Sequence, residues 1–225
     1  KKSIVNQREI GMDTLGWESA LKNAMRQAPD CILIGEIRDR ETMQAAIAYA
    51  QTGHLCLGTL HANNSYHALN RVINFFPIDT RSTLYMDLSV TLKAIVSQRL
   101  VKRKDGRLIP AVEVLLNSYH VQELIEAGDI TALKDAMEQS LAPGSRTFEQ
   151  DLFRLYRSEA ITLQEALQNA DSPTNLSWLI NNHESAGNIA MDEKPREPSF
   201  DPLATNPGSP SYKEFSLSLD DAASG

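Results

Sequence analysis

The chain has 225 residues, of which 42% are hydrophobic and 23% are charged, and its formal net charge at pH 7 is -7. This composition is typical of a globular protein with a buried core, and the negative charge argues against nucleic acid as its main partner. No stretch approaches the roughly 20 apolar residues of a membrane span, and no apolar signal segment opens the chain, so we expect a cytoplasmic protein.

The first half of the chain alternates strand and helix patterns. Residues 31–35 and 55–60 are short, continuous apolar runs, which are typical of parallel strands covered on both faces. Between them apolar residues recur at helical spacing, with Asp39 as the N-cap and Gly53 as the stop signal. The pattern predicts a parallel α/β sheet with right-handed crossovers. In chain order we expect a strand over 3–10, a helix over 15–27 that ends before Ala28-Pro29, a strand over 31–35, the helix capped by Asp39, a strand over 55–60 and a helix over 68–76.

The second half reads mainly as helix. Leu88, Leu92 and Leu100, with the apolar residues between them, predict an amphipathic helix over 88–100. The dipeptide Asp105-Gly106 favours a hairpin turn between two apolar segments. Further helices are predicted over 121–127, 130–139, 148–156, 163–169 and 175–182. We therefore expect an α/β core over 1–116 and a helical C-terminal subdomain over 117–183.

The composition changes at residue 184. From there to residue 225 the chain holds five of its ten prolines, and eight acidic residues outnumber three basic ones. Such a segment buries too little apolar surface to offset the entropy of ordering it, so we expect a disordered acidic tail over 184–225. The alternative is a docking motif around Tyr212, Phe215, Leu217 and Leu219.

Two other features have both a structural and a functional interpretation. Cys31 and Cys56 lie within apolar runs and lack the spacing of metal ligands, so we expect buried, reduced side chains rather than a disulfide or redox pair. The basic segment 102–107 is interpreted as a solvated turn, and the alternative is a contact with an acidic partner or an anionic membrane surface.

Polar side chains follow both predicted parallel strands. Glu36 and Arg38 come directly after the first strand, and Thr59, His61 and Asn63 follow the second. Because ligands of open α/β sheets sit outside the carboxyl ends of the strands, we expect both groups to face one crevice. An apolar strand followed by an acid is how P-loop nucleotide hydrolases place their magnesium-side carboxylate. A single acid or histidine is more often structural, so the interpretation depends on the combination.

These side chains belong to longer runs that resemble the type II/IV secretion ATPase superfamily. The similarity covers roughly residues 1–180 and is greatest to the pilus retraction ATPases of the PilT/PilU type. The stretch Asn117-Ser118-Tyr119-His120 and the acidic tail favour the PilU type. The runs that carry the resemblance are NQRE at 6–9, RQAPDCILIGEIRD at 26–39, TGHLCLGTLHAN at 52–63, RVINFFP at 71–77 and SQRL at 97–100.

The resemblance implies a RecA-like ATPase core, a hexameric ring and ATP bound at the subunit boundaries. Glu36 would be the Walker B acid that acts on Mg²⁺ through water, and His61 and Arg38 would be further catalytic residues. His54 and His61 would form the histidine box, although His54 has a structural or intersubunit contact as its alternative role. The residues implied to bind the nucleotide are Gly35, Glu36, Thr59, His54 and Asn63.

The implied partners are other pilus retraction ATPase subunits, in a homo- or hetero-hexamer, and the inner-membrane platform protein of the pilus. The protein would then lie in the cytoplasm, peripheral to the inner membrane at the pilus base. Pilus-assembly and type II secretion ATPases commonly carry a four-cysteine zinc element, and the chain has only two cysteines, so retraction is preferred. A second alternative is a non-hydrolysing scaffold subunit of the same machine.

One motif of the superfamily is missing. The chain contains no Gly-x-x-x-x-Gly-Lys-Ser/Thr sequence, and the glycine pair Gly53 and Gly58 is followed by Thr59 rather than lysine. Since the chain opens on Lys1 rather than methionine, we expect the phosphate-binding loop and the acidic box to precede it in a larger protein. Without loop amides and a lysine on the phosphates, we expect the 225 residues alone not to turn over ATP.

Overall fold

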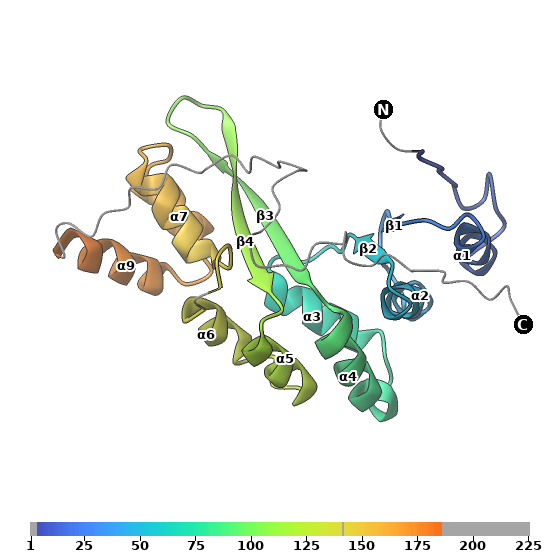
Figure 1. Cartoon of the computed structure of the whole chain (residues 1–225). Helices are drawn as coiled ribbons and strands as arrows, with labels where there is room; N and C mark the ends of the chain where they lie inside the picture. Colours follow the sequence, from blue (N-terminus) through green and yellow to red (C-terminus); the bar gives the residue numbers. More distant parts are fainter. Residues whose placement is uncertain (1–3, 141, 186–225) are drawn as a thin grey trace, which may run out of the picture. The chain divides into compact units, whose positions relative to one another are not determined.

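The computed structural model describes residues 4–140 and 142–185. The disorder and the docking motif predicted for the acidic tail stay predictions over 186–225, which fall outside the described residues. The start predicted at residue 184 is two residues early, because α9 extends to Ser185. The described part is of the predicted α/β class, with alternating helices and strands followed by a long β-hairpin and further helices (Figure 1). Its elements are α1 (Trp17–Met25), β1 (Cys31–Ile34), α2 (Arg40–Gln51), β2 (Leu55–Gly58), α3 (Ser65–Asn74), the 3-10 helix η1 (Ile78–Thr80), α4 (Arg81–Thr91), β3 (Ala94–Lys102), β4 (Leu108–Leu116), α5 (Tyr119–Glu126), α6 (Leu133–Glu138), α7 (Phe148–Arg157), α8 (Leu163–Asn169) and α9 (Pro173–Ser185).

β1 and β2 form a parallel two-stranded sheet in which Ile34 lies opposite Gly58. Parallel neighbours need a crossover, and α2 provides it. α2 begins at the predicted cap, because the Asp39 carboxylate accepts a hydrogen bond of 2.9 Å from the backbone N–H of Thr42. It ends just before Gly53, whose φ of 92° lies in the left-handed region that favours glycine. Both predicted strands and the helix between them are confirmed.

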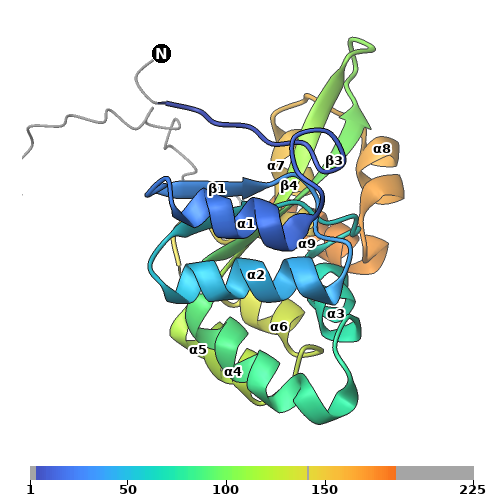
Figure 2. The same ribbon diagram turned by 90° about the vertical axis from the view of Figure 1, so that its right-hand side faces the viewer.

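Within the described residues, only one face of this sheet is covered. α1 and α2 lie against one face of it (Figure 2). Ile32 and Ile34 are buried there in a cluster to which both helices contribute partly buried side chains. Successive strand residues point to opposite faces, so Leu33, Leu55 and Leu57 face away from these helices. Leu33 is 70% exposed, Leu55 52% and Leu57 48%. The expectation that both faces are covered is therefore wrong for the described part of the chain.

The two thiols differ in their surroundings. Both cysteines are free, as expected. Cys31 is exposed because it lies on the same face of β1 as Leu33, so the predicted burial of this side chain is wrong. Cys56 is half-buried, and burial raises the pKa of its thiol.

The strand predicted over 3–10 does not form in residues 4–10. Ile10 makes only an isolated bridge to Thr14, while Ile4 is 94% and Val5 81% exposed. Apolar-polar alternation produces a strand only where a neighbouring strand can pair with it, and no described strand pairs with this segment. The helix predicted over 15–27 forms but is shorter, since α1 starts at Trp17.

The helix predicted over 88–100 is wrong beyond Thr91. α4 ends there, Leu92 has an extended backbone, and residues 94–102 form β3. Each residue of β3 pairs with one of β4 in an antiparallel ladder. Short apolar runs are compatible with both a helix and a strand. Residues 94–102 form a strand because all nine of them pair with residues of β4. The turn predicted at Asp105-Gly106 is confirmed, with Gly106 at a φ of 86°.

The five helices predicted between residues 121 and 182 are all present, as α5 to α9. They do not build a core of their own. α5 and α6 share one hydrophobic cluster with α3, α4 and Leu115 of β4. α7, α8 and α9 share another with Val101 of β3 and Ala111 of β4. Ala111 and Leu115 lie on the same face of β4, so both groups of helices pack along one face of the hairpin, toward different ends. The predicted boundary at residue 116 stays a prediction.

None of the helices within residues 4–140 and 142–185 combines the length and the apolar character that a membrane span requires.

Candidate functional site

The segments that follow β1 and β2 are bonded directly to each other. The backbone N–H of Ile37 donates to the carbonyl of Thr59 at 2.9 Å, and the Thr59 hydroxyl donates to the carbonyl of Gly35. These bonds extend the parallel pairing one step past the strand ends. They bring the segment that carries Glu36 against the segment that carries His61.

Gly58 allows this close approach. A Cβ atom at Gly58 would lie 2.7 Å from Cδ1 of Ile37, a distance that real Cβ contacts do not show. Ile37 is itself buried in the cluster beneath β1. The glycine therefore lets a core side chain next to Glu36 pack against the end of β2.

Glu36, Arg38 and His61 form one polar cluster at the carboxyl ends of the two strands. Nε2 of His61 is 3.1 Å from Oε1 of Glu36, and the Arg38 guanidinium pairs with Oε2 of the same carboxylate. The side chains of Arg38 and His61 are 74% and 79% exposed, whereas that of Glu36 is 21% exposed. The hydrogen bond from Arg38 holds the pKa of Glu36 below its usual value, with smaller contributions from the charges of Arg38 and His61.

The cluster fits one divalent cation held with phosphate. Among the described residues no group of three His, Cys, Asp or Glu side chains could hold a metal ion. Mg²⁺ needs no such group, because it keeps several waters and commonly binds one or two carboxylates and the phosphates of a substrate. The ionised, partly exposed carboxylate of Glu36 is a ligand of this kind.

His54 lies at the other end of the sheet. It precedes Leu55, the first residue of β2, whereas His61 follows the strand. Its Nδ1 is 3.0 Å from the Thr52 hydroxyl, and its ring meets that of Tyr49 edge-on at 6.3 Å. The structure therefore does not bring His54 to Glu36, in contrast to His61.

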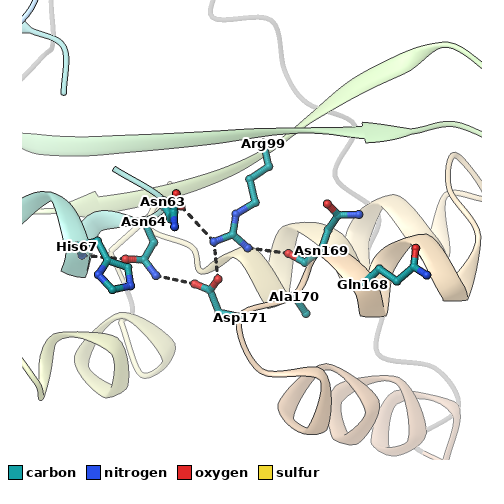
Figure 3. A pocket seen from close by; sticks show the side chains of 8 residues that line it. All are labelled: Asn63, Asn64, His67, Arg99, Gln168, Asn169, Ala170 and Asp171. Carbon is teal, nitrogen blue, oxygen red and sulfur yellow. Dashed lines mark hydrogen bonds and ion pairs between the residues drawn. The ribbon is translucent and has the colours of Figure 1, made fainter. Parts of the chain in front are cut away.

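Asn63 lines a different pocket, of about 310 Å³, to which neither Glu36 nor His61 contributes (Figure 3). Its backbone carbonyl accepts a hydrogen bond of 3.1 Å from Arg99 of β3. Arg99 also pairs with Asp171, in the turn between α8 and α9. The residues that line this pocket are Asn63, Asn64, His67, Arg99, Gln168, Asn169, Ala170 and Asp171.

Sequence reasoning missed the contact between Arg99 and Asp171. The sequence marks Arg99 only as part of the run at 97–100, and Asp171 lies 72 positions away. A buried carboxylate, Glu113 of β4, was missed as well. It accepts bonds of 2.7 Å from the backbone and the hydroxyl of Ser65 at the start of α3. Burial raises the pKa of Glu113.

Known proteins resemble this chain in sequence and in overall structure. The family model described as "Type II/IV secretion system protein" matches residues 4–148. The chain is 53% identical over 178 residues to the type IV pilus ATPase PilU of Pseudomonas aeruginosa, covering 79% of the chain and 47% of that protein. It is 35% identical to the type IV pilus retraction ATPase PilT of the same species, over 78% of the chain and 51% of PilT.

A solved structure is also similar. The crystal structure of the pilus retraction motor PilT with bound ADP superposes with a TM-score of 0.72 at 36% identity, over 79% of the chain and 50% of that structure. The chain thus spans about half the length of the relatives that it matches.

Proposed function

Because the chain belongs to the type II/IV secretion system protein family, we propose that it is part of an ATPase motor that retracts type IV pili and drives twitching motility. The observation that carries the proposal is the contact of 3.1 Å between Glu36 and His61 at the carboxyl ends of two parallel strands. This is where an open α/β sheet binds its ligand. PilU and PilT are both named as type IV pilus ATPases, which supports ATP as the substrate and the type IV pilus as the machine.

In this proposal the cluster of Glu36, Arg38 and His61 binds the phosphate groups of ATP and their Mg²⁺. Glu36 would hold the cation through water, and Mg²⁺ would neutralise the charge on the phosphate oxygens. Arg38 fixes one oxygen of Glu36, and the exposed His61 ring faces the other. A hydrogen bond from the Thr59 hydroxyl to the Gly35 carbonyl holds the two segments together, which keeps Glu36 and His61 in register.

The remaining proposals concern assembly. We propose a RecA-like core and a homo- or hetero-hexamer with other pilus retraction ATPase subunits, located in the cytoplasm beside the platform protein of the inner membrane. His54 would then act between subunits, since its place at the amino end of β2 keeps it from Glu36 within one chain. Asn63 would act by holding the segment after β2, because its carbonyl is bonded to Arg99.

We propose that the 225 residues alone supply the Mg²⁺-binding part of the site but do not turn over ATP. They contain the carboxylate and the histidine but no phosphate-binding loop sequence. Such a loop supplies the amides and the lysine that stabilise the transition state. Steady phosphate release by the purified chain, abolished in Glu36→Gln, would contradict this part of the proposal.

Motility tests the function directly. A piliated bacterium that lacks its PilU-type ATPase would be complemented with the full-length protein, and twitching zones would be measured at matched protein levels. We expect wild type and the control Glu41→Gln, an exposed acid in the first turn of α2, to restore twitching. Glu36→Gln and His61→Ala should not restore it.

Two outcomes separate the alternatives, the first in this strain and the second in a strain that lacks its assembly ATPase. Full twitching with Glu36→Gln would overturn the hydrolysing role and favour a non-hydrolysing accessory subunit. Restored surface pili in a strain that lacks its assembly ATPase would instead favour a pilus-assembly or secretion ATPase.

A further inference from the structure

Arg99 connects three separate segments of the chain (Figure 3). From β3, its Nη2 donates to the carbonyl of Asn63 at 3.1 Å, and its Nη1 donates to the carbonyl of Asn169 at 2.7 Å. The same guanidinium pairs with the carboxylate of Asp171. The segment after β2 is therefore bonded to the turn between α8 and α9 through one side chain.

The Arg99 side chain has little freedom to leave this position. Only 20% of it is exposed, and its guanidinium carbon lies 4.0 Å from the ring centre of Phe148, which is fully buried. A guanidinium over an aromatic face gains a cation–π attraction. Its planar group of donors also fits two carbonyls and a carboxylate at fixed directions, which the single ammonium of lysine cannot do.

Asp171 makes a second connection to the same segment. Its Oδ2 accepts a bond of 2.7 Å from the side-chain amide of Asn64. The carbonyl oxygen of that amide caps α3 by accepting from the backbone N–H of His67 at 2.9 Å. Two consecutive residues are thus attached to the α8–α9 turn: Asn63 through Arg99, and Asn64 directly through Asp171.

The other end of this segment is attached through Thr59 to Gly35 and Ile37, which follow β1. His61 lies between the two attachments, and its own carbonyl accepts a bond of 3.2 Å from Arg71 of α3. We call residues 59–64 the His61 loop. Its backbone is fixed on both sides of the histidine, while the ring itself is exposed.

We propose that Arg99 and Asp171 are positioning residues that hold the His61 loop in place, so that the α8–α9 turn controls where His61 meets Glu36. The effect on turnover rests on the proposed ATPase function, whereas the effect on the loop does not. Neither residue touches the Glu36 cluster, so both act through the loop. A displacement of the α8–α9 turn is transmitted to the histidine by the two asparagines.

The test compares Arg99→Lys and Asp171→Asn with a matched control, Arg154→Lys. Arg154 also pairs with an aspartate, Asp151, but contacts no residue of the His61 loop. Hydrogen–deuterium exchange of the full-length protein, followed by mass spectrometry, would report on the peptide that covers 59–68. We expect about tenfold faster exchange there in Arg99→Lys and Asp171→Asn, the size of effect typical of a broken polar network. The double variant should exchange little faster than either single variant.

Kinetics separate positioning from a general loss of stability. In Arg99→Lys and Asp171→Asn, kcat for ATP should fall about tenfold while KM changes less than about twofold. The reason is that these variants disturb the position of His61 for the reaction rather than the binding of ATP. Unchanged exchange over 59–68, or an equal change in Arg154→Lys, would overturn the inference. Faster exchange in a protein whose wild type does not hydrolyse ATP would support the positioning role and refute the proposed function.

Discussion

Nε2 of His61 lies 3.1 Å from Oε1 of Glu36, although the two residues follow different strands of the sheet. Their contact depends on the bonds between Ile37 and Thr59 and between Thr59 and Gly35, which join the two segments just past the strands. A change that moves these segments apart should therefore affect both stability and the site.

Gly58→Ala tests the close packing beside Glu36. The new Cβ would overlap Cδ1 of Ile37, and overpacking of a core contact typically costs about 1–3 kcal/mol. Ile37→Val removes that atom and alone should cost about 1 kcal/mol. In the double variant the overlap is relieved, so its loss of unfolding free energy should be smaller than the sum of the single losses. Urea unfolding of the four proteins measures this coupling, and additive losses would show that the two residues do not compete for space.

Asp39→Ala tests the start of α2. Thr42 donates from its hydroxyl and its backbone N–H to the Asp39 carboxylate, and these bonds lower the carboxyl pKa. Losing such an N-cap costs about 1 kcal/mol of stability, whereas Asp39→Asn keeps an acceptor and should cost far less. Because the folded pKa is lowered, the contribution of the charge should be present at neutral pH and disappear as the pH falls below about 3.8. Equal unfolding free energies for the alanine and asparagine variants at pH 7 would contradict this role.

Glu113→Gln tests the buried carboxylate that accepts two hydrogen bonds from Ser65 at the start of α3. Burial raises the pKa of Glu113 above its usual value near 4.5, so the folded state keeps a proton that the unfolded state releases. Wild-type stability should therefore decrease as the pH rises from about 4.5 through the folded pKa, a loss that glutamine cannot show. The unfolding free energy of Glu113→Gln relative to wild type should increase between pH 4.5 and pH 7. The exposed Glu126→Gln is the control, and the same pH dependence in all three proteins would refute the assignment.

The meeting of Glu36 and His61 could be predicted because it follows from local patterns. Two apolar runs with a capped helix between them imply parallel neighbours, and the carboxyl ends of parallel neighbours lie together. The roles of the site residues stay predictions, but their convergence is observed for Glu36 and His61. The separate position of His54 also follows once β2 is known to start at Leu55.

Other features could not be predicted, because they depend on distant contacts. The segment at 94–102 became a strand through pairing with 108–116, a choice that apolar spacing alone does not reveal. Arg99 and Asp171 meet across 72 positions through a turn between two helices whose placement no local pattern encodes. The exposure of Leu33 is another case, since an apolar run does not say which of its faces is covered.

The central claim is that Glu36 is the acid of an ATP-hydrolysing site, and steady-state ATP hydrolysis by the full-length protein tests it most directly. With Mg²⁺ present, Glu36→Gln should lower kcat about a hundredfold or more, while Glu41→Gln should leave it unchanged. Hydrolysis by Glu36→Gln at the wild-type rate would contradict the account.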